Sequence, residues 1–185
     1  DYVRSEDIPN IELYMDQVTS FMDEQISSSK RYDDDKILTK TMINNYAKNN
    51  LLPPPVKKKY SKEHVIVMIF IYYFKTILSI KDIETILTPI TEKYFGTDSA
   101  VDVASIYEEV CNTAKGQIQN LKDEVREAYE TSQNTFKDME GLSDSDREYL
   151  QLFSLISSLS FDVYAKKALI ERIIDELPEP VRKKK

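Results

Sequence analysis

Glycine and cysteine are scarce in this 185-residue chain, which has three glycines, seven prolines and one cysteine. So few turn-forming residues argue against a β-barrel or a β-sandwich and favour long helices. The single cysteine, Cys111, cannot form an intramolecular disulfide. Because no signal-peptide pattern accompanies it, we expect a reducing, cytoplasmic environment.

Long apolar runs are missing as well. The most apolar stretch, Val65–Phe74, has ten residues, whereas a helix that spans a membrane needs about 20. We therefore expect this stretch to form a buried core helix, and we expect no association with a membrane.

Residues that carry catalysis or bind metals are sparse. The one histidine, His64, lies far in the sequence from Cys111, so neither a Cys–His nucleophile nor a zinc site is indicated. The three glycines are scattered and form no phosphate-binding loop. Carboxylate pairs such as Glu108-Glu109 fit the solvated face of a helix, and the Glu-x-x-His elements of a carboxylate metal centre are absent. The sequence predicts a protein that is not an enzyme and has no cofactor or metal.

Helical periodicity, in contrast, runs along most of the chain. Apolar residues recur three or four positions apart, and polar residues suited to capping precede several of these segments. We expect N-caps at Thr39, Ser61, Ser79 and Ser143, a helix end at Pro89 and a break near 157–160. No segment has the alternating pattern of a strand. The sequence predicts an all-α fold with helices near residues 13–26, 40–49, 62–78, 80–87, 102–139 and 144–177.

The character of the chain changes after Gly96. We predict one domain over residues 1–95 and a long helix with a C-terminal helical region over residues 96–185. Residues 102–139 carry a single narrow apolar stripe on a helix of up to about 38 residues. Such a stripe predicts pairing with another helix, within the chain or in a second copy.

Charge is unevenly distributed. The net charge is −7, yet residues 36–64 contain seven lysines and one glutamate, which leaves the rest of the chain strongly acidic. A basic island of this kind is typical of a surface that binds phosphates, although lysines on a solvated loop would look the same. The basic tail Arg182–Lys185 is expected to be disordered.

The segment 37–87 resembles the DNA-binding half of MerR-type regulators. The resemblance rests on the order and spacing of Leu51-Leu52-Pro53 and Tyr60-Ser61, which stand between a short polar helix and a long apolar one. It implies a helix-turn-helix domain that binds double-stranded DNA. It also implies a homodimer through 102–139, as an antiparallel coiled coil.

The residues that this resemblance assigns to DNA lie in two groups. The recognition helix would be Lys40–Lys48, whose amides can pair with adenine and whose lysines can reach guanine or phosphate. The wing would follow it, with Lys58 where these regulators hold a phosphate; Val56–Lys59 looks too short for a full hairpin. The candidate DNA-binding residues are Lys40, Thr41, Asn44, Asn45, Lys48, Lys57, Lys58, Lys59 and Tyr60.

A closer resemblance covers roughly the first 90 residues. The elements Leu-Tyr-Met-Asp-Gln at Leu13–Gln17 and Pro-Pro-Pro-Val-Lys-Lys-Lys at Pro53–Lys59 are similar to those of a bacterial family known as a domain of unknown function. This family supplies no activity.

Two hypotheses of function remain open from the sequence. The first is a dimeric transcriptional regulator of MerR-like type, which requires Asn44, Lys48, Lys57 and Lys58 to be exposed. The second is a protein–protein interaction module on a helix-turn-helix scaffold that no longer binds DNA, which burial of Asn44 and Asn45 would favour.

Overall fold

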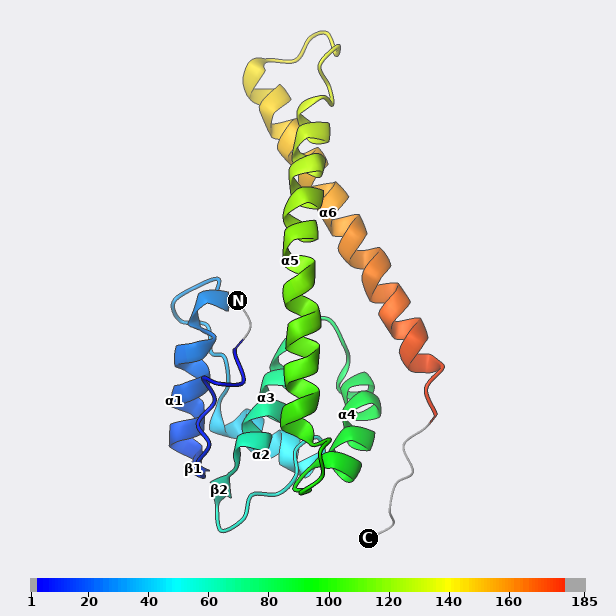
Figure 1. Ribbon diagram of the computed structural model, residues 1–185. Coiled ribbons are helices and arrows are strands. Elements are labelled where there is room, and N and C mark those ends of the chain that lie inside the picture. The colour runs from blue at the N-terminus through cyan, green and yellow to red at the C-terminus, as the bar shows by residue number, and fades with distance from the viewer. Residues whose placement is uncertain (1–2, 179–185) are drawn as a thin grey trace. The chain divides into compact units, whose positions relative to one another are not determined.

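The protein is described by a computed structural model covering residues 3–178 (Figure 1); the basic tail Arg182–Lys185 lies outside these residues. The described part is mainly α-helical, as predicted. Its elements are β1 (Leu13–Tyr14), α1 (Met15–Gln25), the 3-10 helix η1 (Ser27–Ser29), α2 (Lys40–Lys48), β2 (Lys59–Tyr60), α3 (Lys62–Phe74), α4 (Ile80–Tyr94), α5 (Val103–Gln133) and α6 (Asp144–Asp175).

The chain divides into two compact units. The first contains the residues up to 112 together with those from 174 onward, and the second contains residues 113–173. No helix of the described residues is long and apolar enough to cross a membrane.

Helix α3 forms the centre of the first unit. Every residue from His64 to Ile71 is buried, which confirms the prediction that this apolar stretch is a core helix. The other helices of the unit contribute buried apolar side chains, each worth about 1.5–3 kcal/mol on burial: Val18 and Met22 from α1, Ile43 and Tyr46 from α2, and Ile83 and Leu87 from α4.

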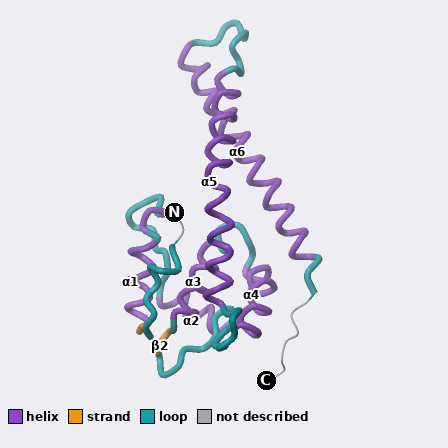
Figure 2. Tube along the Cα trace, viewed as in Figure 1, coloured by secondary structure: helices purple, strands orange, loops and turns teal. Residues whose placement is uncertain are grey.

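The prediction that the chain has no strand is wrong, because the structure contains a small antiparallel sheet. Strand β1 pairs with β2, with Leu13 opposite Tyr60 and Tyr14 opposite Lys59, and Val56 forms a further bridge to Lys59. Figure 2 shows how short these strands are beside the helices. Two-residue strands carry too little alternation to be recognised in a sequence.

The ends of the later helices also differ from the prediction. Pro89 lies inside α4, which continues to Tyr94. An internal proline removes one hydrogen bond at a cost of about 3 kcal/mol, and burial of Ile83 and Leu87 on the same helix offsets it. Helix α5 ends at Gln133 rather than near 139, and α6 is unbroken through residues 157–160.

The second unit is a helical hairpin made by α6 and the part of α5 after residue 112. The loop between the helices is held by Gln151, whose side-chain amide donates to the carbonyls of Gln133 at 2.9 Å and Thr135 at 3.2 Å. Ser143 caps α6 as predicted, because its hydroxyl accepts from the backbone N–H of Asp146 at 3.1 Å.

Candidate nucleic-acid interface

Helix α2 presents a polar face to solvent. Lys40, Thr41, Asn44, Asn45 and Lys48 are all exposed, while Ile43 and Tyr46 on the opposite side are buried. The burial of Asn44 and Asn45 that would have favoured the interaction module is therefore not observed. The exposed face offers two amides and two ammonium groups, the groups that read base edges and contact phosphates.

Both ends of α2 are fixed. Thr39 caps the helix as predicted, since its hydroxyl accepts from the backbone N–H of Met42 at 3.2 Å. At the other end, the N–H groups of Leu51 and Leu52 donate to the Tyr46 carbonyl at 2.9 and 3.3 Å. Asn50 adopts the left-handed conformation, with φ of 57°, that often follows a helix.

A two-residue hairpin follows the proline segment. The N–H of Val56 donates to the carbonyl of Lys59 at 3.1 Å, and the N–H of Lys59 donates back to Val56 at 2.9 Å. Lys57 and Lys58 form the turn between them, with φ of 51° and 64°. Positive φ at both central residues is typical of a type I′ turn, whose preferred sequence is Asn-Gly. In the sequence Val56–Lys59 looks too short for a full hairpin, and in the structure these four residues form a tight hairpin turn closed by a single bridge.

The left-handed conformation of these two lysines is costly. An L-residue with a Cβ loses roughly 1–2 kcal/mol in this region relative to ordinary backbone. Lys57 and Lys58 are both exposed, and neither forms an ion pair with the described residues. Strained residues persist where surrounding structure enforces them, and they are frequent at functional sites.

The base of the hairpin is anchored in the core. Tyr60 is 3% exposed, and its ring packs edge-on against His64 with centroids 5.5 Å apart. The Nδ1 atom of His64 accepts from the backbone N–H of Ser61 at 3.0 Å, and Nε2 lies 3.4 Å from the carbonyl of Pro54. Burial lowers the pKa of His64, so the neutral ring that makes both contacts is the favoured form.

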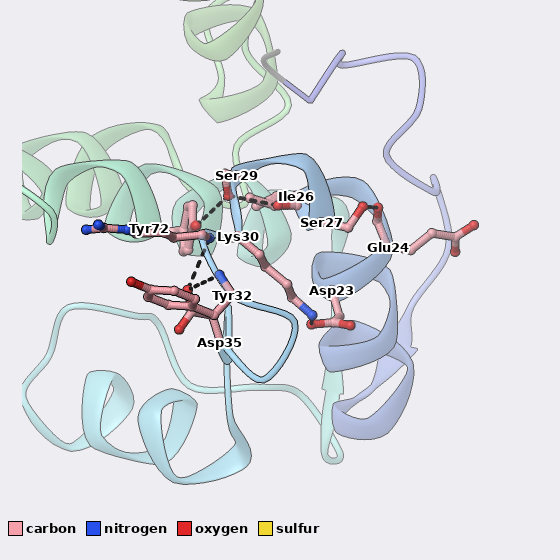
Figure 3. A network of polar contacts seen from close by, with 10 residues as sticks. Asp23, Glu24, Ile26, Ser27, Ser29, Lys30, Tyr32, Asp35 and Tyr72 are labelled. Carbon is pink, nitrogen blue, oxygen red and sulfur yellow. Dashed lines mark hydrogen bonds and ion pairs between the residues drawn. The ribbon is translucent and has the colours of Figure 1, made fainter. Parts of the chain in front are cut away.

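The segment between α1 and α2 is tied to its neighbours (Figure 3). The hydroxyls of Ser29 and Tyr72 lie 2.6 Å apart, which joins this segment to α3. Lys30 forms an ion pair with Asp23 of α1 at 2.8 Å.

Two further contacts fix the approach to α2. The Asp35 carboxylate accepts from the backbone N–H groups of Arg31 and Tyr32 at 3.1 and 3.0 Å, so one of the aspartates before α2 stabilises its own loop. Lys75, at the end of α3, donates to the carbonyl of Ile37 at 3.1 Å. Burial lowers the pKa of Lys75.

The candidate lysines differ in their partners. Lys40 forms an ion pair with Asp16, and Lys59 pairs with Glu12 at 3.4 Å. The Lys59 side chain is 36% exposed and the other three are more than half exposed. Because such solvent-accessible pairs contribute only about 0–1 kcal/mol, another anion could replace either carboxylate at little cost. In contrast, Lys48 has no such partner among the described residues.

The sequence-predicted set therefore divides in two. The candidate side chains on α2 and those of Lys57 and Lys58 are exposed, and Lys59 is half-buried. In Figure 1, α2 and the hairpin lie at the lower end of the first unit. Tyr60 must be removed from the set, because its ring is buried and supports the hairpin. Sequence reasoning missed the supporting roles of His64 and Lys75, since nothing in their spacing indicates which carbonyl each approaches.

The chain matches the family described as a domain of unknown function, DUF1836, over residues 3–110. The chain belongs to this family. The match ends within α5 and includes both α2 and the Lys57–Lys58 hairpin. No curated protein and no solved structure matches the chain.

Proposed function

We propose that this member of the family is a cytoplasmic, DNA-binding transcriptional regulator with a MerR-like winged helix-turn-helix. Helix α2 would be the recognition helix, and the Lys57–Lys58 hairpin would be the wing. The observation that carries the proposal is the tip of the hairpin, where two adjacent lysines are held in a left-handed conformation on a buried base. A turn selected for stability alone would use asparagine and glycine there.

In this proposal the two elements divide the work. Asn44 and Asn45 would contact base edges in the major groove, where an amide can pair with adenine through two hydrogen bonds. Lys48, Lys57 and Lys58 would contact phosphates, which fix position and supply most of the affinity. Two copies of the chain, related by a two-fold axis, would double these contacts and bind half-sites about 34 Å apart.

The alternative proposal is a protein–protein interaction module on the same scaffold. It is favoured by the carboxylates that already form ion pairs with Lys40 and Lys59 and by the net charge of −7. In that case the exposed lysines would bind an acidic partner or remain solvated.

Titration of fluorescently labelled duplex DNA, followed by polarisation at low and moderate salt, separates the two proposals. The test variant is Lys57→Glu/Lys58→Glu. The matched control is Lys115→Glu/Lys122→Glu, which makes the same change of charge at exposed positions of α5. If the first proposal is right, the wild type binds, binding weakens steeply with salt, and only the hairpin variant loses it. Absence of binding at about 50 mM salt, or equal loss in both variants, would reject the hairpin as a DNA-binding element.

A further inference from the structure

The second unit has no apolar core of its own. Of the described residues 113–173, only Ser132 and Gln151 are buried, and both are polar. Long helices in water are stabilised mainly by packing an apolar face rather than by intrinsic propensity. Another surface must therefore cover this hairpin.

Helix α6 carries the apolar face that is left uncovered. At 100° per residue, six of its exposed apolar side chains fall within a sector of about 120°, whereas Phe161, Leu169 and Ile173 are also exposed but lie outside that sector. The helix contacts α5 through the side that adjoins this sector, where Leu159 and Asp162 share a groove with Val125 and Ala128. The residues of the uncovered face, which we call the α6 stripe, are Tyr149, Leu152, Phe153, Ile156, Val163 and Tyr164.

Most of the stripe lies on an uncharged segment. Residues 149–161 contain no Asp, Glu, Lys or Arg, although 31% of the whole chain is charged. Charged residues stand on both sides of the segment: Asp144, Asp146, Arg147 and Glu148 before it, with a net charge of −2, and Asp162, Lys166 and Lys167 after it, with a net charge of +1. A solvated helix rarely lacks charge over almost four turns.

We propose that the α6 stripe is the contact surface between two copies of this chain, packed antiparallel about a two-fold axis near residues 156 and 157. An axis at this position places Tyr149 opposite Tyr164 of the second copy. It also places the large side chain of Phe153 opposite the small one of Ser160, which allows the two faces to interdigitate. The pairing is self-complementary, as a two-fold interface requires.

Charge supports this orientation. In the antiparallel pairing Asp146 lies opposite Lys167 of the second copy, which within one chain pairs with Glu171 of its own helix at 3.5 Å, so a carboxylate meets an ammonium group at each end of the interface. A parallel pairing would bring like charges together at both ends. The antiparallel arrangement also aligns the two helix dipoles favourably.

The area of the stripe is sufficient for a stable dimer. Tyr149, Ile156 and Tyr164 are 69%, 61% and 72% exposed, and large apolar and aromatic side chains offer about 150–250 Å² each. The stripe therefore exposes roughly 700 Å² of side-chain surface per copy, close to the ~800 Å² per partner of a standard interface.

This proposal differs from the dimer expected through residues 102–139. Part of the α5 stripe already faces α6 within one chain, since Val125 and Ala128 line the shared groove. The proposal does not rest on DNA binding. A protein that dimerises without binding DNA would reject only the proposed function, and a monomer that binds DNA would reject only the α6 interface.

Sedimentation equilibrium of the full chain tests the interface. The test variants are Phe153→Glu and Ile156→Glu, and the control is Leu169→Glu. Leu169 is 58% exposed on the same helix, but it lies on the side of the helix opposite the stripe. We expect a wild-type dimer, dissociation constants raised at least ~100-fold in the two test variants, and an unchanged dimer in the control. Circular dichroism of each variant checks that helicity is retained.

A charge exchange tests the orientation. Lys167→Glu is expected to weaken the dimer about tenfold, and Lys167→Glu/Asp146→Lys is expected to restore it, whereas Asp146→Lys alone weakens it. A monomeric wild type at all concentrations, a dimer that withstands Ile156→Glu, or a double variant weaker than both single ones would overturn the proposal.

Discussion

Replacing the two strained lysines by the preferred turn residues should make the protein more stable and a poorer DNA binder. The variant is Lys57→Asn/Lys58→Gly, at positions with φ of 51° and 64°. Glycine adopts positive φ without steric cost, and asparagine tolerates it better than lysine. Each lysine carries about 1–2 kcal/mol of strain, and the greater freedom of glycine in the unfolded chain offsets part of the relief. We therefore expect the free energy of unfolding to rise by about 1–2 kcal/mol.

Thermal and urea unfolding, followed by circular dichroism, measure this gain. For a chain of this size, 1 kcal/mol corresponds to about 2–4 °C in Tm, so the midpoint is expected to rise by about 2–8 °C. The urea dependence of the free energy of unfolding should be unchanged, because the turn is exposed in both states.

DNA binding should change in the opposite direction. The substitution removes two cationic groups from each copy, or four from a two-fold dimer. If each contacts a phosphate, the slope of log K against log salt becomes less steep by about 3–4. The control Lys115→Gln/Lys122→Gln removes the same charge from exposed positions on α5 and should leave both the slope and Tm unchanged.

Two results would refute this reasoning. A variant with lowered Tm would mean that the lysines contribute to stability rather than reduce it. A more stable variant with unaltered DNA affinity and salt slope would mean that the strain serves no DNA contact, and that the hairpin must be excluded from the interface.

Three further predictions follow from the same contacts. Burial lowers the pKa of His64, the one histidine of the chain. As pH falls, the unfolded chain therefore takes up the proton before the folded one does. The free energy of unfolding should have its full value above pH ~6.5 and decrease below it, by up to ~1.4 kcal/mol per pH unit. Urea unfolding between pH 7.5 and 5.5 measures this, and His64→Gln, which keeps a hydrogen-bond acceptor at that position, should flatten the dependence in this window. Thr39→Ala removes the cap of α2 and should lower the free energy of unfolding by about 1 kcal/mol; no change in urea unfolding would contradict the cap. Asn44→Ala should reduce discrimination between the preferred duplex and one with a single changed base pair by about 1–3 kcal/mol, whereas equal weakening on both duplexes would assign Asn44 to the DNA backbone.

Local signals allowed much of the first unit to be predicted. The caps Thr39 and Ser79 each accept from the backbone N–H three residues later, and the apolar run after Ser61 is buried on all sides. These features depend on neighbours within one turn of helix, and such neighbours are visible in the sequence. Pro89 was mispredicted because the packing that compensates for it comes from the tertiary structure.

The candidate site was predicted only in part, for a similar reason. The exposed face of α2 follows from helical spacing, with Ile43 and Tyr46 marking the buried side. The hairpin does not, because two lysines are among the least expected residues for a type I′ turn. Its formation depends on β1, which is far away in the sequence and pairs with Lys59 and Tyr60. A turn that a distant strand imposes cannot be recognised from its own residues.

In the second unit, the sequence pattern predicts the helix α6 correctly but does not predict which of its sides is exposed. The periodicity of α6 predicts a helix with apolar positions, and the helix is present without a break. Periodicity alone cannot say which of two apolar sides faces the rest of the chain. The groove with Val125 and Ala128 identifies one side as internal, and the large side chains that remain exposed identify the other. Because most of those side chains lie on a segment free of charge, with Asp146 before it and Lys167 after it, the most complementary surface for the second side is the same segment of another copy.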